Sequence, residues 1–165
     1  MQEHKLENEI HIHRPQREVF RYVTQPWRWH EWHPASESAT PSTWDLQVGD
    51  RFDETVSMRP FAWIPIRMRR QLSWVVVQSE APALWEVHGT SRTIDVRVRY
   101  EIDPADGTRF RRTFHYAVKG WMRFIERRFV LPRMRTQSVV ALQNLKQALE
   151  TQAHAEHIPV YQETT

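Results

Sequence analysis

Three charged residues fall on the apolar side of segments that alternate with period two, and they are the candidates for chemistry. These are Glu54, Arg70 and Arg112. Alternate residues of a strand share one face of a sheet, so each of these side chains is expected to point toward the interior. There a carboxylate and a guanidinium can move a proton and polarise a carbonyl group, so we take the three as candidate catalytic residues.

Glu54 and Arg70 are predicted to pair across a hairpin. If the strands flanking the apolar, proline-bounded loop 59–65 align Met58 with Ile66, Glu54 lies directly opposite Arg70. Buried opposite charges are tolerated when they are paired and hydrogen-bonded, which favours this register. Two interpretations remain open, a structural ion pair at the rim of the interior and a pair that anchors a ligand.

Arg112 raises the same question on the last predicted strand. The aromatic residues at alternate positions beside it place its side chain inward, near Tyr100 of the preceding strand. It can bind a ligand carboxylate or enolate, or it can extend along the sheet until its charge reaches solvent at the edge. Tyr100 and Tyr116 can donate hydrogen bonds to a ligand carbonyl, although buried tyrosines more often satisfy the backbone.

Other arrangements that could do chemistry are weaker. His11 and His13 share a strand face, and His30 and His33 lie close in sequence, but no carboxylate stands at metal-ligand spacing, so we expect no metal. No catalytic-triad order, phosphate loop or dinucleotide fingerprint is present, so we expect no cofactor. Cysteine is absent, which excludes disulfides, thiolate chemistry and cysteine zinc sites.

Length and composition indicate a single globular domain. The chain has 165 residues, which we divide into a domain of residues 1–152 and a mobile tail of residues 153–165. No apolar run reaches the length of about 18 residues that spans a bilayer, and the N-terminus does not resemble a signal peptide. We therefore expect a soluble, cytoplasmic protein.

The elements that must position the candidates follow from hydrophobic periodicity. Apolar residues recur every three or four positions in the stretch 120–152, which predicts a long helix with a kink at Pro132. The stretch 51–118 alternates with period two and predicts most of an antiparallel sheet of about six to seven strands. A first strand at 6–12 is followed by two short helices, at 15–23 and 27–32. The expected fold class is α+β.

Arginine dominates the positive charge. The 23 basic residues comprise 20 arginines and three lysines, and the net charge is +3. Six arginines are predicted to point outward from the sheet: Arg67, Arg69, Arg97, Arg99, Arg109 and Arg111. Glu86, Asp95 and Glu101 interrupt this stripe, which favours a solvated face of mutually paired charges over a nucleic-acid footprint.

Three stretches carry a resemblance to a known family. They are the run IHIHRP leading into EVFRYVT at residues 10–24, the aromatic run at residues 26–34, and VALQNLKQALE at residues 140–150. With the order of elements, they make the chain similar to the polyketide cyclase/dehydrase and lipid-transport superfamily, also called START-like or SRPBCC. The resemblance implies a helix-grip fold, in which a curved sheet wraps a C-terminal helix and leaves an apolar cavity between them.

The resemblance and the strand faces together define the expected ligand site. Its predicted lining is Phe52, Met68, Trp74, Trp85, Val98, Tyr100, Phe114, Tyr116, Trp121, Phe124 and Leu142. We expect binding or transport of a hydrophobic or amphipathic small molecule or lipid, by a monomer or a homodimer. One alternative is a cyclase or dehydratase that acts on a polyketide-like carbonyl substrate. Another is an adaptor that contacts a membrane surface or a protein through Trp63 and the region of Arg127 and Arg128.

Two apolar segments have no obvious partner in the core. They are residues 61–66 and the start of the predicted final helix, residues 121–131. In the resembled fold these regions lie at the same end of the domain, so we expect them to meet and cover the mouth of the cavity. They form either a gate that opens for the ligand or a static plug.

Overall fold

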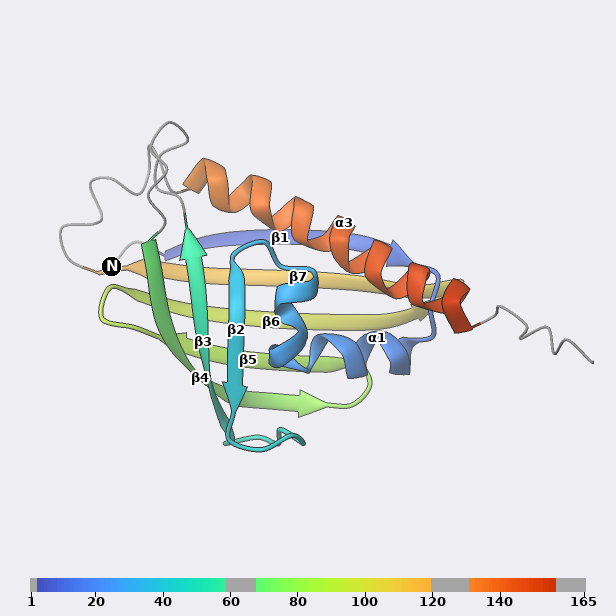
Figure 1. Cartoon of the computed structure of the whole chain (residues 1–165), viewed down its shortest axis with the longest axis horizontal. Helices are drawn as coiled ribbons and strands as arrows, with labels where there is room; N and C mark the ends of the chain where they lie inside the picture. Colours follow the sequence, from blue (N-terminus) through green and yellow to red (C-terminus); the bar gives the residue numbers. More distant parts are fainter. Residues whose placement is uncertain (1–2, 59–67, 120–130, 157–165) are drawn as a thin grey trace, which may run out of the picture.

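The computed structural model describes residues 3–58, 68–119 and 131–156, which form one curved antiparallel sheet, a long helix and two short helices (Figure 1). The strands are β1 (Glu3–Ile12), β2 (Ser36–Pro41), β3 (Arg51–Met58), β4 (Met68–Glu80), β5 (Leu84–Thr90), β6 (Ile94–Ala105) and β7 (Gly107–Val118). The helices are α1 (Gln16–Val23), the 3₁₀-helix η1 (Pro26–Glu31) and α3 (Leu131–Glu156). The α+β helix-grip architecture expected from the sequence is confirmed.

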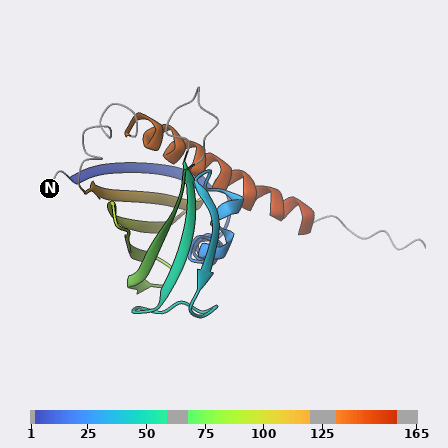
Figure 2. The ribbon, with the colours of Figure 1, turned by 60° about the vertical axis from the view of Figure 1, so that its left-hand side comes forward.

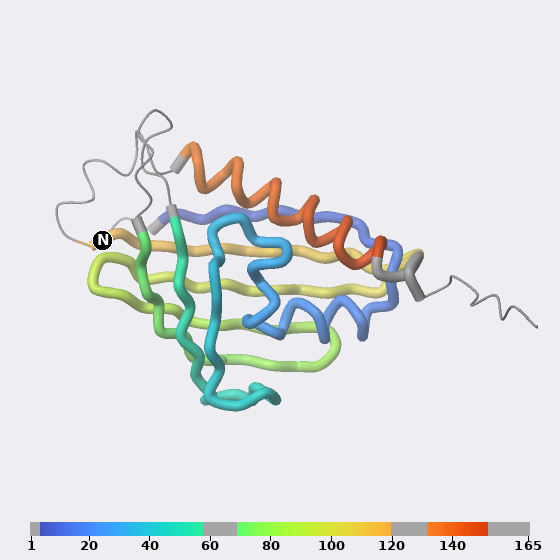
Figure 3. The backbone as a smooth tube through the Cα atoms, viewed as in Figure 1, coloured from blue at the N-terminus to red at the C-terminus, as the bar shows by residue number. Residues whose placement is uncertain are grey.

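The strand order β1-β7-β6-β5-β4-β3-β2 places the first strand beside the last one (Figure 3). The remaining neighbours follow in sequence, so each is joined to the next by a short connection or through the segment 59–67. The β6–β7 hairpin turns at Gly107, whose φ of 97° favours glycine. A Cβ atom there would lie 2.5 Å from the carbonyl oxygen of Ile12, so glycine also lets this turn approach the end of β1.

The β3–β4 pairing corrects the predicted register by two residues. Met58 faces Met68 rather than Ile66, so Glu54 lies opposite Leu72 and Arg70 opposite Val56. Glu54 and Arg70 are therefore not the cross-strand neighbours that the sequence predicted. The length of the connecting loop sets the register of a hairpin. Here the paired residues of β4 begin at Met68, beyond residue 65, where the loop was expected to end. A shift of two residues preserves the face of every side chain.

Aromatic side chains on η1 and the inner face of the sheet pack together in the core of the domain. The ring of Trp29 meets those of Phe52, Trp74 and Trp85 edge-on, at centroid distances of 5.4, 5.9 and 6.1 Å. The indole N–H of Trp29 donates to the carbonyl oxygen of Val23, so this buried donor is satisfied. Two tryptophans of the aromatic run 26–34, Trp29 and Trp32, are therefore part of the core.

Helix α3 lies along β1 and passes the two short helices (Figure 2). Its buried face carries Ala141, Leu142, Leu145 and Leu149, as the three- and four-residue spacing predicts. Pro132 is the second residue of α3 as the structure describes it. The helix continues to Glu156, so residues 153–156 belong to it rather than to the tail that the sequence suggested. Alanine at two of those positions supports this extension.

Several predictions fall outside the described residues. They concern the two cover segments at 61–66 and 121–131, the stretch before Pro132 on which the predicted kink at that residue depends, the ligand-lining residues Trp121 and Phe124, the outward Arg67, and the adaptor residues Trp63, Arg127 and Arg128. The side chain of Met68 also belongs to this group.

Candidate functional site

Arg112 lies inside the domain, and its guanidinium does not reach solvent. The residue is 6% exposed, and its Nη1 donates to Ser138 Oγ at 3.1 Å. Its Nη2 lies 3.2 Å from Nε2 of His33, and its Nε has no acceptor among the described residues. The guanidinium carbon also lies 5.2 Å from the ring centroid of Phe114. Of the two interpretations that the sequence left open, extension to the sheet edge is wrong.

A chain of hydrogen bonds connects Arg112 to β1 and α3. The hydroxyl of Ser138 donates to Oδ1 of Asn8 at 2.6 Å, and its oxygen accepts from Arg112. Asn8 is the cross-strand partner of Arg112 in the β1–β7 ladder. Asn8 and Ser138 were not predicted as site residues, although each is the polar member of an otherwise apolar series.

His33 completes this polar group from the segment that follows η1. The residue as a whole is half-buried, while its ring is desolvated; that desolvation, and then the Arg112 charge, lowers the pKa of His33 to about 3. The imidazole is therefore neutral near physiological pH. The backbone N–H of Ala35 approaches Nδ1 at 3.3 Å, so both ring nitrogens face a donor.

Glu54 is the second buried ionisable group on the inner face. It is 4% exposed, and its Oε2 accepts a hydrogen bond from the indole Nε1 of Trp74 at 3.0 Å. Burial raises the pKa of Glu54 to about 7, against the lowering effects of its hydrogen bonds and of the Arg112 charge. Among the described residues no cation lies within ion-pair distance of its carboxylate.

Arg70 stands apart from Glu54. Its guanidinium is half-buried and donates to Thr93 Oγ1 at 2.5 Å. Both the structural ion pair and the ligand-anchoring pair that the sequence suggested for Glu54 and Arg70 are therefore wrong. The shift of the β3–β4 register is the reason.

Electrostatic effects on pKa values link four ionisable residues of the interior: Glu54, Tyr100, Arg112 and His33. Burial raises the pKa of Tyr100 to about 12, and the charges of Arg112 and Glu54 act on it in opposite directions. Tyr100 is also the cross-strand partner of Arg112 in the β6–β7 ladder, as the sequence predicted. Two of the three candidate catalytic residues, Glu54 and Arg112, are thus brought into one buried region, and Arg70 is not.

The predicted ligand-lining residues mostly lie in this interior. Phe114 is half-buried, and seven others are buried: Phe52, Trp74, Trp85, Val98, Tyr100, Tyr116 and Leu142. Trp74 stacks on Phe52 at 5.8 Å, and Trp85 stacks on Tyr100 at 5.7 Å. Together they make an aromatic wall around the buried charges. That these residues line one cavity stays a prediction.

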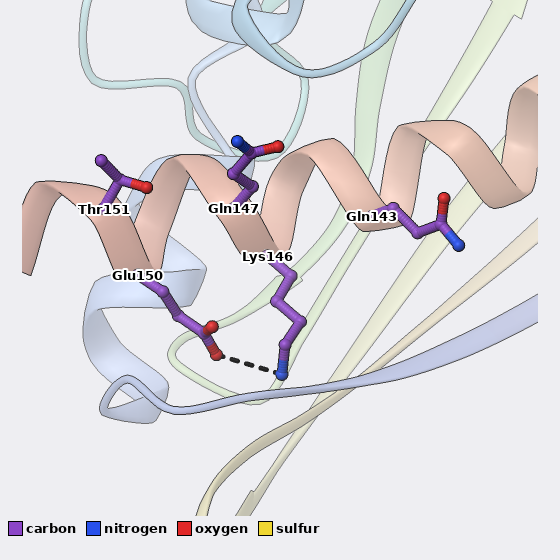
Figure 4. A pocket seen from close by; sticks show the side chains of 5 residues that line it. All are labelled: Gln143, Lys146, Gln147, Glu150 and Thr151. Atoms are coloured by element: carbon purple, nitrogen blue, oxygen red, sulfur yellow. Dashed lines mark ion pairs between the residues drawn. The ribbon is translucent and has the colours of Figure 1, made fainter.

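A surface depression lies along α3, away from the buried charges. Its lining is Gln143, Lys146, Gln147, Glu150 and Thr151, all from this one helix (Figure 4). Lys146 forms an ion pair with Glu150 at 3.1 Å and donates to the carbonyl oxygen of His11 at 2.7 Å. The backbone N–H of His13 donates to Glu150 at 2.9 Å. These contacts attach α3 to the end of β1 and give the depression a structural role.

The outer face of the sheet carries paired charges, as predicted. Arg99 pairs with Glu86 at 2.8 Å, and Arg111 pairs with Glu9 at 2.9 Å. The other outward arginines of the described strands also have acidic partners: Arg69 with Glu37, Arg97 with Glu86, and Arg109 with Asp103. Each cation is therefore neutralised locally.

The described residues include neither a metal-binding cluster nor a membrane-spanning helix. No group of three or more His, Asp or Glu side chains there is arranged to hold a metal ion. The described helices also include none that is long and apolar enough to cross a membrane.

Comparison with known proteins identifies the family. Residues 3–150 match the model of a family described as polyketide cyclase / dehydrase and lipid transport. No curated protein matches the chain.

Solved structures share the fold at low sequence identity. Protein MLL2253 from Mesorhizobium loti is 18% identical with a TM-score of 0.64, over 90% of this chain and 98% of that one. The di-domain ARO/CYC StfQ from the steffimycin biosynthetic pathway is 12% identical with a TM-score of 0.70, over 92% of this chain and 52% of StfQ. Ara h 8.0201 is 11% identical with a TM-score of 0.63, over 91% of this chain and 99% of that one.

These structural likenesses concern the fold alone, and the chain spans about half of StfQ. The family model is more informative, because it covers β1 through most of α3 in one match. The chain therefore belongs to the polyketide cyclase / dehydrase and lipid transport family, within the START-like (SRPBCC) superfamily.

Proposed function

We propose that this protein binds a hydrophobic or amphipathic small molecule or lipid between the inner face of the sheet and α3. The observation that carries the proposal is the burial of Arg112 and Glu54 within an aromatic wall, where neither has an ion-pair partner among the described residues. Folding alone gives little reason to bury such groups, because each buried charge without a counter-charge destabilises the domain. A ligand offers that reason, and the family includes lipid-transport proteins.

Native mass spectrometry of the purified protein tests the proposal directly. We expect a co-purified apolar ligand, and after its removal we expect saturable binding of the neutral fluorophore N-phenyl-1-naphthylamine. The matched variants are Leu142→Phe, which enlarges a buried residue of α3, and Val139→Phe, which enlarges an exposed residue of the same helix. Leu142→Phe should weaken binding of the fluorophore, and Val139→Phe should not. Absence of both a co-purified ligand and fluorophore binding would refute the proposal.

A second candidate function is catalysis of the cyclase or dehydratase type, and Glu54 is the observation that favours it. A carboxyl whose pKa is about 7 can both accept and donate a proton at neutral pH, which general acid–base catalysis requires. Arg112 would stabilise the oxyanion that forms when a proton leaves the carbon next to a carbonyl. Glu54 would take that proton and later return one to the same carbon.

Hydrogen–deuterium exchange at carbon tests this second function without knowledge of the natural substrate. In deuterated buffer, we expect the protein to accelerate exchange at the α-carbons of 2-undecanone, followed by NMR. Glu54→Gln should abolish the acceleration. The control is Glu86→Gln, because Glu86 is a buried carboxylate that pairs with Arg99 on the outer face. Equal rates with and without the protein would leave binding as the function.

A further inference from the structure

The guanidinium of Arg112 has more hydrogen-bond donors than the described residues have acceptors for it. Ser138 Oγ and His33 Nε2 lie at hydrogen-bond distance from it, the Tyr100 hydroxyl also interacts with it, and its buried Nε has no acceptor among the described residues. A guanidinium carries five N–H groups, more than these three contacts use. Buried donors are normally satisfied, so an unused N–H at this depth indicates a place for an acceptor.

His33 is a poor partner for this arginine. A neutral imidazole has one nitrogen with a lone pair and one nitrogen that carries a proton. Arg112 approaches Nε2 while the backbone N–H of Ala35 approaches Nδ1, so His33 can accept from one of these donors and not from both. The described polar groups around Arg112 therefore leave its Nε–H without an acceptor and offer only a shared one at His33.

Arg112 also has no ion-pair partner in the part of the chain that the structure describes. Within the described residues no carboxylate lies at ion-pair distance from its guanidinium, whereas the outward arginines of the same strand, Arg109 and Arg111, each have one. Glu54 influences Arg112 only from beyond that distance. A buried cation without a counter-ion is a site at which an anion gains both charge pairing and hydrogen bonds.

The surroundings of Arg112 suit a molecule with one anionic end and an apolar body. The ring of Phe114 lies beside the guanidinium, and Tyr100 and Trp85 continue the same row of paired residues across β6 and β5. Ser138 approaches from α3, so the charge lies where sheet and helix meet. We propose that Arg112 is an anion subsite and that the ligand is an amphipathic molecule bearing a carboxylate, an enolate or a similar oxyanion. This inference rests on the proposed binding function.

A matched pair of fluorophores tests the anion subsite. The sulfonate 8-anilinonaphthalene-1-sulfonate and the neutral N-phenyl-1-naphthylamine share their ring system and differ in the charged group. We expect the wild-type protein to bind the sulfonate at least about tenfold more tightly, which corresponds to about 1.4 kcal/mol. Arg112→Met should remove that preference while leaving binding of the neutral probe within about twofold. Dodecanoate should then displace the sulfonate from the wild type more effectively than 1-dodecanol does.

Arg111→Met is the control, because it removes the same charge from the adjacent residue on the outer face, where Arg111 pairs with Glu9. This variant should retain the preference for the sulfonate. Binding of the neutral probe without any preference for the anion would overturn the subsite and leave the proposed function intact. Binding of neither probe would overturn the proposed function itself.

A measurement on the wild-type protein keeps the test decisive if Arg112→Met does not fold. In ¹⁵N-labelled protein, the Nε–H resonance of Arg112 should shift when the sulfonate is added and should stay in place with the neutral probe. Arg112→Lys, which retains the charge, assigns that resonance by its loss. A resonance that stays in place with both probes, while the sulfonate binds, would place the anion elsewhere.

Discussion

Glu54 and Arg112 illustrate how burial on one sheet face determines the chemistry of single residues. Glu54 has its pKa raised to about 7 because water is excluded, whereas the equally buried Arg112 is a permanent cation whose Nε has no acceptor among the described residues. The two groups therefore differ in what they can do, since one can exchange a proton at neutral pH and the other can stabilise negative charge. Each property can be measured without knowledge of the ligand.

Glu54 should make the stability of the fold depend on pH. Its pKa is 4.5 in its ordinary state and about 7 in the fold, so the folded protein binds this proton more tightly. The stability that the proton contributes is fully present below pH 4.5 and is lost as the pH rises through 7. We expect Glu54→Gln to remove this loss, which amounts to about 3 kcal/mol. The difference in unfolding free energy between variant and wild type, from urea titrations across this range, measures it, and a constant difference would contradict the buried acid.

Arg112 should contribute little to the stability of the ligand-free fold. Methionine fills much of the same volume and leaves no uncompensated buried charge, and such replacements are often neutral or stabilising. We therefore expect ligand-free Arg112→Met to unfold with a free energy within about 1 kcal/mol of the wild type, or higher. Urea titration measures it, with Arg111→Met as the control for loss of an outer-face charge. A loss of more than about 3 kcal/mol would indicate that Arg112 is held for structural reasons.

At the scale of elements, close approaches between strands and helices hold the polar residues in place. Trp74 on β4 reaches Glu54 because its indole lies directly over Gly89 on β5, where a Cβ atom would come within 2.6 Å of the ring. Helix α3 is held against β1 by Lys146 and Glu150 at one end and contributes Ser138 near the other. The site thus depends on the sheet register and on the docking of the helix together.

Gly89→Ala should displace the indole of Trp74. The added methyl group cannot fit beside the ring, so we expect a cost of about 2 kcal/mol in unfolding free energy and loss of the hydrogen bond to Glu54. The indole N–H resonance of Trp74 should move in the ¹⁵N spectrum. Thr90→Ala, at the exposed neighbouring position, is the control and should leave that resonance unchanged. An unchanged resonance in Gly89→Ala would contradict the close contact.

Lys146 should stabilise the docking of α3 on β1. Lys146→Met removes the hydrogen bond to the carbonyl of His11 and the ion pair with Glu150, and we expect a loss of about 1 kcal/mol. Backbone amides of the last turns of α3 should then exchange faster with deuterium. Gln147→Met changes the adjacent exposed residue and should alter neither quantity. Equal exchange in both variants would show that the apolar face alone holds the helix.

At the scale of the whole molecule, charge is distributed so that the outer face is neutralised and an interior cation is not. The net charge is only +3, and the outward arginines of the described strands pair with acidic residues. We expect no saturable binding of a short DNA duplex below about 10 µM protein at physiological salt, because paired cations release few counterions. Fluorescence anisotropy measures this. Saturable binding that weakens steeply with added salt would show that the arginine face has a nucleic-acid partner.

The sequence by itself determined the faces of the strands, the buried stripe of α3 and the family resemblance. All of these depend on local periodicity or on short runs of residues, because a period of two or 3.6 assigns a side chain to a face without reference to its partner. The inward placement of Glu54 and Arg112 followed from the same rule, and the structure confirms it. The predicted strand faces were correct even where the predicted β3–β4 register was wrong, because an error of two residues leaves every side chain on the same face.

Only the tertiary structure decided which groups meet in the interior. The contacts of Arg112 with Ser138 and His33 join residues that are 26 and 79 positions away in the chain. No local pattern encodes a contact across such a separation, because it depends on where α3 docks and where the chain returns after η1. The separation of Glu54 from Arg70 was decided in the same way, by the point at which a loop closes and pairing begins. The sequence could therefore name a buried carboxylate and a buried guanidinium, and only the fold could choose their neighbours.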